Sequence, residues 1–290
     1  MSPLLIALIL SVAPVQPAKA APPLNPAPSL NPAMVVHLLE AKKLHALDQI
    51  LGDIQRRFER GQASEFELRN AYRPFYKLPP RADRALEEWA AAEPHSYPAH
   101  LAHGIHLRKQ ADAVRGGKWF RDTPEMNIVS MNQLLGQSKE ELERSLKLTA
   151  KPYLSLQHLM AVTWKLGLPS ATRALLDKAD KILPHNRLAR VRYMDSLTPR
   201  WGGSYAAMNA YIQECEAQGV DVDGLDQLRA MMYDDMGDAL MEANKRKEGL
   251  ALLRKALQLA KHFGPNFPKD VLYSASFYLC RGKVVDANCL

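Results

Sequence analysis

Four histidines stand close together in the sequence, at His95, His100, His103 and His106. On a helix, His100 and His103 are neighbours, as are His103 and His106, so that two imidazoles could share one metal ion. Three side chains spaced by three residues drift around the helix, however, and the His-Glu-x-x-His pattern of zinc proteases does not occur. We therefore predict hydrogen-bonded or solvated histidines and no metal site.

The stretch DVDGLD, residues 221 to 226, resembles the middle of a calcium-binding loop. With Gly224 at loop position six, the first and last positions are Gly219 and Ala230, whose side chains offer no oxygen donor. We interpret these aspartates instead as carboxylates at a helix N-terminus, where they favour the helix dipole.

Asp234, Asp238 and Glu242 form an acidic stripe with the spacing of one helical face. Paired carboxylates can perform acid-base chemistry. No second helix shows carboxylates at a matching spacing, so we predict a solvated face. The sequence also lacks the G-x-S-x-G, P-loop and dinucleotide-binding motifs, and we predict neither a catalytic residue nor a cofactor.

The stretch TPRWGGSYAAM, residues 198 to 208, interrupts a chain rich in helix-forming residues. Pro199 disfavours helical geometry in the residue before it, and Gly202 and Gly203 supply freedom for a turn and a close approach of backbones. Ser204 can cap a following helix. Trp201 then packs as a wedge between neighbouring helices. The stretch predicts a rigid corner.

The same corner has a functional interpretation, which the sequence leaves open. A helix N-terminus binds anions readily, and an arginine beside it can clamp a carboxylate or a phosphate. The candidate residues for binding a ligand or partner are Arg200, Trp201, Ser204 and Asp122.

Apolar residues recur at steps of three and four along most of the chain, which predicts about a dozen helices and no sheet. Clear examples are Leu44 to Phe58, Leu225 to Ala239 and Leu250 to Ala260. Short connections between them favour antiparallel neighbours. Helix starts are indicated by Thr123-Pro124 and by two apparent capping boxes, Ser64 with Glu67 and Ser138 with Glu141.

A degenerate repeat is present near the period of 34 residues. Ala179, Leu176 and Leu159 precede Pro184 at the offsets of the tetratricopeptide pattern, and Ala260, Leu257 and Leu240 precede Pro265 in the same way. Met160 and Met241 replace the glycine of that pattern. We predict an all-α fold, an irregular α-solenoid of antiparallel helix hairpins that is degenerate and tetratricopeptide-like.

Three segments together resemble a bacterial family known only as domain of unknown function 4034 (DUF4034). They are TPRWGGSYAAM, the upstream VRGGKWFRDTPEMNIVSMNQLL (114 to 135) and RVRYMDSL (190 to 197). The resemblance covers roughly residues 45 to 285, and Pro199 to Ser204 is its most specific element. It implies a helical fold, in some members attached to repeat modules, and it implies no chemistry.

The N-terminus is typical of a secreted protein. An apolar run from Leu4 to Val15 followed by Ala18-Lys19-Ala20 matches a signal peptide over residues 1–20, and it is too short for a membrane-spanning helix. An uncleaved anchor is the alternative. Residues 21–32 hold five prolines and predict an extended tether. Residues 33–290 then form a single helical domain without a transmembrane segment, and the expected location is periplasmic or secreted.

The formal net charge of +7 is spread over basic residues interspersed with acidic ones, which does not favour nucleic-acid binding. Three cysteines occur. In an oxidising compartment Cys280 and Cys289 are the better placed pair for a disulfide, while Cys215 is expected to be buried as a small apolar side chain.

A helical-repeat protein offers a concave surface to peptides or proteins. We therefore expect a secreted or periplasmic interaction module with a protein or peptide partner. The alternative is a periplasmic enzyme acting on envelope material, with its site near the PRWGGS corner. A groove lined with aromatic residues would favour binding, and a pocket with converging acid, base and arginine would favour catalysis.

Overall fold

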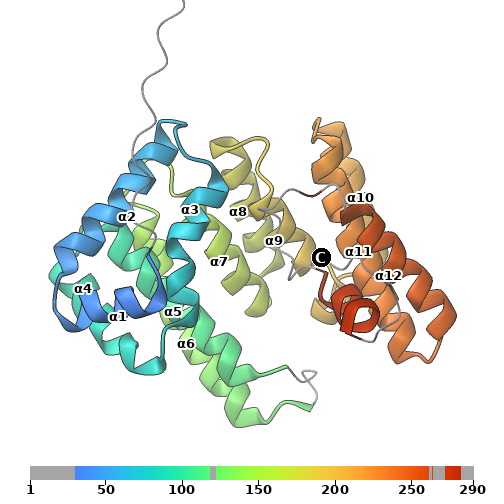
Figure 1. Ribbon diagram of the computed structural model, residues 1–290, viewed down its shortest axis with the longest axis horizontal. Helices are drawn as coiled ribbons and strands as arrows, with labels where there is room; N and C mark the ends of the chain where they lie inside the picture. Colours follow the sequence, from blue (N-terminus) through green and yellow to red (C-terminus); the bar gives the residue numbers. More distant parts are fainter. Residues whose placement is uncertain (1–29, 118–121, 261–262, 264–271, 282–290) are drawn as a thin grey trace, which may run out of the picture.

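A computed structural model describes residues 30–117, 122–260, 263 and 272–281, and every regular element in these ranges is helical (Figure 1). The predicted signal peptide and most of the proline-rich tether lie outside the described residues. The α-helices are α1 (Pro32–Glu40), α2 (Leu44–Glu59), α3 (Glu65–Tyr72), α4 (Asp83–Ala92), α5 (Tyr97–Arg115), α6 (Glu125–Ser145), α7 (Tyr153–Lys165), α8 (Pro169–Ile182), α9 (Leu188–Ser196), α10 (Tyr205–Ala217), α11 (Val222–Glu242), α12 (Arg246–Ala260) and α13 (Tyr273–Ala275). Shorter helical turns are η1 (Arg73–Lys77), η2 (Pro80–Ala82), η4 (Pro199–Trp201) and η6 (Ser276–Arg281).

Helices that follow one another in sequence make the most extensive contacts. The leading pairs are α5 with α6, α11 with α12, and α7 with α8 (Figure 1). The last two are the hairpins in which the tetratricopeptide offsets were found. The N-terminal helices depart from nearest-neighbour stacking, because α2 also contacts α5 and α3 contacts α7. The all-α fold is thus confirmed, and a regular solenoid stays a prediction.

Local sequence signals account for several helix ends. Ser64 and Glu67 form the predicted capping box at the start of α3: the Glu67 backbone N–H donates to the Ser64 hydroxyl, and Glu67 Oε2 accepts from the Ser64 N–H at 2.8 Å. At the start of α5, the Ser96 hydroxyl accepts from the Ala99 N–H at 3.0 Å. Gly116 then ends α5 with a positive φ of 71°, which favours glycine.

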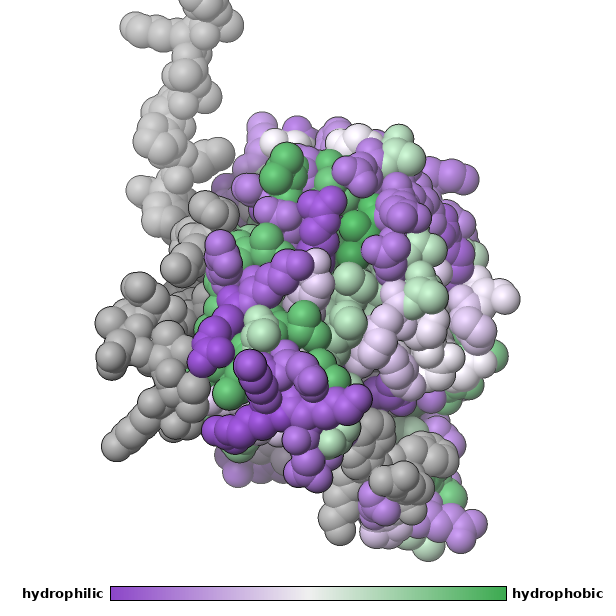
Figure 2. All heavy atoms as spheres, turned by 90° about the vertical axis from the view of Figure 1, so that its right-hand side faces the viewer, coloured by the Kyte–Doolittle hydropathy of each residue, from purple (hydrophilic) through white to green (hydrophobic). Residues whose placement is uncertain are grey.

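Two hydrophobic clusters stabilise the described part of the chain. The larger one runs from α1 to α11 and includes the fully buried Trp89 and Tyr153. The smaller one joins α11, α12 and α13 around Leu253. Figure 2 shows the α10–α12 side of the molecule, where hydrophilic side chains predominate and apolar patches are scattered among them. Within the described residues, no helix combines the length and apolar character needed to cross a membrane.

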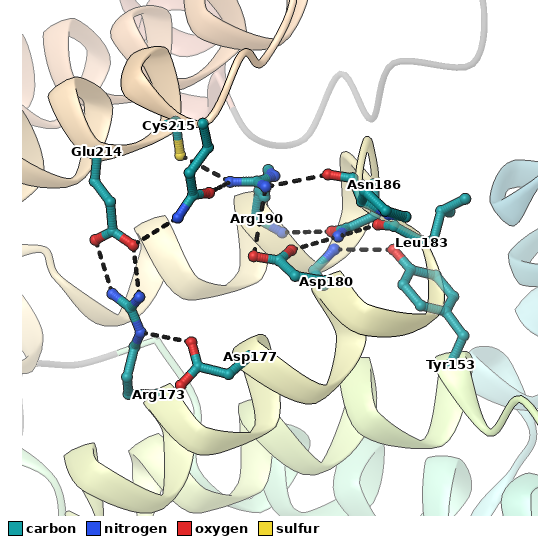
Figure 3. A network of polar contacts seen from close by, with 12 residues as sticks. Tyr153, Arg173, Asp177, Asp180, Leu183, Asn186, Arg190, Glu214 and Cys215 are labelled. Carbon is teal, nitrogen blue, oxygen red and sulfur yellow. Dashed lines mark hydrogen bonds and ion pairs between the residues drawn. The ribbon is translucent and has the colours of Figure 1, made fainter.

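Polar side chains of α8 and α9 join these two helices to α10 (Figure 3). The Arg173 guanidinium of α8 donates to both oxygens of Glu214 on α10, at 2.8 and 2.5 Å. The buried Arg190 of α9 donates to the Cys215 sulfur at 3.1 Å and to the side-chain oxygen Oε1 of Gln218 at 3.0 Å. Cys215 is fully buried, as predicted. Fork-shaped arginine contacts of this kind fix geometry as well as contributing energy, so they hold α10, and the corner before it, in a defined position.

Candidate functional site

A cavity of about 730 Å³ lies between α4, α5 and α6, three helices that lie together in the N-terminal part of the fold (Figure 1). Its volume falls in the range of about 300–1,000 Å³ that is usual for ligand pockets. Charged side chains of both signs and small apolar residues share its wall. The charged and histidine residues include Asp83, Glu87, His100, His103, Glu141 and Arg144, and the apolar ones include Ala90, Ala91 and Leu107.

Glu141 of α6 receives three basic side chains in this wall. His100 Nδ1 lies 2.6 Å from Glu141 Oε2, and Arg144 Nη1 donates to Oε1 at 2.9 Å. The other ring nitrogen, His100 Nε2, donates to the Pro94 carbonyl at 3.1 Å. Both nitrogens of His100 therefore face acceptors. Burial alone would raise the pKa of Glu141, but its contacts with His100 and His103 lower that pKa to about 2.

His103 lies between two carboxylates in the same wall. Its Nε2 is 3.5 Å from Asp83 Oδ1 on α4, and its Nδ1 is 3.8 Å from Glu141 Oε2. The residue is 7% exposed, and within the described residues Nδ1 has no hydrogen-bond partner. Burial would lower the pKa of His103, but Asp83 and Glu141 outweigh it and raise this pKa to about 9.

Glu141 and His103 therefore carry fixed charges near neutral pH. General acid-base catalysis works best when the pKa of the catalytic group lies near the operating pH. In this pocket the contacts move the pKa of Glu141 down and that of His103 up, away from neutrality. In the described part of the chain, no three metal-ligating side chains come together to hold a metal ion. The wall is suited to electrostatic recognition of a ligand rather than to proton transfer.

The sequence analysis singled out the histidines of this wall, but it assigned Glu141 to a helix start and did not predict its contact with them. Ser138 and Glu141 were predicted as a capping box at a helix start, and this is wrong because α6 continues through both residues to Ser145. The Ser138 hydroxyl instead donates to the Gly104 carbonyl of α5 at 2.7 Å. The histidines were predicted to be hydrogen-bonded or solvated, and His100 is hydrogen-bonded, while His100, His103 and His106 are all buried rather than solvated.

The PRWGGS stretch forms a tight connection between α9 and α10. Pro199–Trp201 is the short helix η4, and Gly202 follows with a φ of 85°, in the left-handed region. A Cβ atom on Gly203 would lie 2.0 Å from the Leu197 carbonyl oxygen, so only glycine fits this close approach. The Ser204 hydroxyl accepts from the N–H of the third residue of α10, which confirms the predicted cap.

Trp201 is half-buried at this corner. Its ring centroid lies 5.7 Å from that of Trp164 on α7, and the Arg115 guanidinium of α5 lies 5.0 Å above its ring. Trp201 thus bridges helices that are distant in sequence. Arg200 lies 4.0 Å from the Asp238 carboxylate of α11. Arg200, which was predicted to bind a ligand or partner, is therefore directed toward a carboxylate of the protein itself.

The remaining sequence-predicted residues belong to other segments of the chain or fall outside the described ranges. Asp122 is exposed in the connection between α5 and α6. Cys289 lies outside the described residues, so the disulfide with Cys280 stays a prediction. Asp221 is the N-cap of α11, as predicted, and accepts from the Gly224 N–H at 2.8 Å.

The acidic stripe of Asp234, Asp238 and Glu242 on α11 was predicted to be a solvated face. For Asp234 this prediction is wrong. Asp234 is buried, and its two oxygens accept from the Ser274 and Ala275 N–H groups at 3.2 and 2.7 Å. Burial raises the pKa of Asp234 to about 7, although the two N–H donors oppose this shift.

The geometry defines an all-helical protein with a charged interhelical pocket. Residues 31–183 match the model of the family described as Domain of unknown function (DUF4034), and the chain belongs to this family. The matched segment contains α1–α8 and the whole pocket wall. The PRWGGS corner lies outside it, although the corner was the most specific part of the resemblance. Neither the curated proteins nor the solved structures gave a match.

Proposed function

We propose that this protein is a helical interaction module that binds a segment of a protein or peptide partner in the pocket between α4, α5 and α6. The observation that carries the proposal is the open cavity of about 730 Å³ whose wall combines both signs of charge with small apolar residues. A peptide segment supplies the complementary features, namely charged side chains, a polar backbone and apolar side chains.

Binding is favoured over catalysis by the state of the charged groups. A pKa of about 9 for His103 and of about 2 for Glu141 keeps the first protonated and the second ionised at neutral pH. Fixed charges contribute to specificity because a partner with like charges at the same places is rejected. The alternative, a periplasmic enzyme with its site at the corner, has less support because Arg200 already lies beside Asp238.

The proposed compartment is the periplasm or the cell exterior. It rests on the sequence of residues 1–20, with an apolar run followed by a cleavage-type Ala-Lys-Ala sequence. A partner would accordingly be another protein of the envelope. The DUF4034 family membership is compatible with this role and adds no chemistry to it.

Site-specific photocrosslinking in the native compartment tests the proposal. A photoreactive residue replaces Gln137, an exposed glutamine on the pocket wall, and the matched control carries it at Gln258, an exposed glutamine on α12. We expect Gln137 to capture a defined partner segment that Gln258 does not capture. The captured segment is then synthesised as a peptide and titrated calorimetrically against the purified protein.

A bulky substitution then tests whether the peptide binds in the pocket. Ala91 is an exposed wall residue, and Ala91→Trp fills part of the cavity; Ala251→Trp on α12 is the matched control. We expect A91W to weaken peptide binding by about tenfold or more, on the scale of a central interface contact, and A251W to leave it unchanged. Equal affinity of A91W and the unaltered protein would reject the pocket as the binding site.

A further inference from the structure

A second polar cluster on α5 brings three cationic side chains to one carboxylate. Arg108 Nη1 donates to Asp112 Oδ2 at 3.1 Å, and Lys109 Nζ lies 3.6 Å from the same oxygen. Lys165 of α7 contacts the other oxygen, Asp112 Oδ1. The cluster therefore has an excess of two positive charges, and no role for it follows from the pocket between α4, α5 and α6.

The charges of Arg108 and Lys165 are largely withdrawn from water, whereas Lys109 and Asp112 are partly exposed. The hydrogen bonds of Arg108 are incomplete. Arg108 is 2% exposed, and its Nε has no hydrogen-bond partner within the described residues. The fully buried His158 accepts or donates one hydrogen bond, with the Tyr76 hydroxyl at 3.1 Å, and its Nδ1 has no partner in the described part of the chain. Burial, followed by the charges of Arg108 and Arg192, lowers the pKa of His158 well below its usual value, so that this ring is neutral.

Aromatic rings and a fourth cation adjoin the cluster. The Arg192 guanidinium of α9 lies 5.7 Å from the Trp164 ring centroid, and the Lys165 ammonium lies 5.9 Å from it. Trp164 in turn packs against Trp201 of the corner. Both indoles are half-buried, and Trp164 Nε1 is buried without a hydrogen-bond partner among the described residues. An indole N–H is a donor only, and it would suit an anionic oxygen.

Crowding like charges in a poorly solvated place is unfavourable unless an opposite charge is supplied. One carboxylate does not supply enough here, because burial and the neighbouring Arg108 and Arg192 lower the pKa of Lys165 to about 8 even though Asp112 opposes that shift. A ligand with two negative charges would balance the cluster. A phosphate monoester carries about −1.5 to −2 at neutral pH and has three acceptor oxygens.

We propose that the cluster of Arg108, Lys109 and Lys165 is a binding site for a phosphate monoester, with Trp164 and Trp201 beside the esterified group. Donors from α5 and α7 approach Asp112 from two helices, so that a bound phosphate would accept from both. The site is separate from the proposed peptide pocket, and either proposal can fail while the other stands.

Titration calorimetry with two probes tests the site and distinguishes its source of phosphate. Inorganic phosphate tests the anion alone, and phenyl phosphate adds a ring that can reach the indoles; chloride at equal ionic strength is the blank. We expect both phosphates to bind the purified full-length protein. Phenyl phosphate should bind more tightly, because its ring can stack on the indoles and make apolar contact with them. Equal affinity of the two probes would assign the site to free phosphate and overturn the monoester.

Three variants connect the binding to the cluster. Lys165→Gln removes one donor and one charge, and we expect it to weaken phenyl phosphate binding by about tenfold or more. Lys165→Arg keeps the charge and is expected to retain most of the affinity. Lys255→Gln is the matched control, because Lys255 lies 4.2 Å above the Tyr233 ring, a lysine on an aromatic ring elsewhere in the fold. Its affinity should not change.

A purely structural role for the cluster gives a different pattern. In that case Lys165→Gln lowers the melting temperature by the same amount with and without phenyl phosphate, and the unaltered protein gains no stability from either phosphate beyond that from chloride. Either result overturns the proposal. Succinate is a dianion without phosphate oxygens. If succinate binds as tightly as phenyl phosphate, the assignment of the site to phosphate is overturned.

Discussion

Deprotonation of His103 should destabilise the protein as the pH rises, and the structure sets the size of the effect. The pKa of His103 is raised from 6.5 to about 9 by Asp83 and Glu141 against the opposing effect of burial. Each pKa unit corresponds to about 1.4 kcal/mol, so that the shift is worth about 3 kcal/mol of folding free energy. The lowered pKa of Glu141 reflects the same contacts, and its energy is not added to this value.

The direction of the effect follows from the protons bound in each state. Below pH 6.5, His103 is protonated in both the folded and the unfolded chain, and the stabilisation is complete. Between 6.5 and about 9 the folded chain holds a proton that the unfolded chain has lost, so the free energy of unfolding falls as the pH rises. For Glu141 the sign is opposite: its stabilisation is present above 4.5 and is lost as the pH falls toward about 2.

Denaturant titrations of the unaltered protein and of His103→Gln, at matched pH values, isolate this contribution. Other groups titrate in both proteins, and their effects cancel in the difference between the two free energies of unfolding. We expect that difference to shrink by about 3 kcal/mol as the pH rises from 6.5 through 9. Asp83→Asn removes one of the two carboxylates and should move the transition to lower pH. A difference that does not depend on pH would refute the electrostatic account of the pocket wall.

Three further substitutions have defined outcomes. Gly203→Ala places a Cβ atom against the Leu197 carbonyl and should lower the free energy of unfolding by about 1–3 kcal/mol, whereas the matched control Gly136→Ala, in open space on α6, should raise it slightly; denaturant titration measures both. Trp201→Ala should lower the melting temperature, since the half-buried ring contacts α5 and α7, and unchanged melting with loss of a partner would contradict the wedge. The stability of Asp234→Asn relative to the unaltered chain should rise as the pH increases from 3.8 to about 7, because over this range the folded chain holds a proton on Asp234 that the unfolded chain has lost; identical pH profiles would contradict this.

Local signals in the sequence were sufficient for most helices and for the corner. The apolar stripes along α2 and α12 lie on buried faces, and the stripe along α11 is buried from Leu225 to Met232 but ends at the exposed Ala239. Ser64 and Ser204 are caps, as predicted. These features depend on residues within about one helical turn of each other, which a periodicity or a capping pattern records directly.

The pocket wall depends on contacts that no local pattern contains. Glu141 meets His100 across 41 positions in the sequence, and the spacing of Ser138 to Glu141 occurs equally at a helix start and within a helix. Asp234 is buried by Ser274 and Ala275 from 40 or more positions away. In both cases the sequence gives the chemical type of the residue, and only the packing of helices decides its partner and its pKa.

The two polar sites, around His103 and around Arg108, could not be predicted from an amphipathic pattern because both lie on α5. His103 and Arg108 are five residues apart, which places them about 140° apart around a helix, so the polar residues of α5 occupy more than one side. The helix is nonetheless buried along most of its length, between α4, α6 and α7. Buried ion pairs are poor sources of stability compared with apolar side chains of similar volume. The histidine, arginine and carboxylate groups on two sides of this central helix are therefore weak sources of core stability, and this supports the two binding sites that we propose for them.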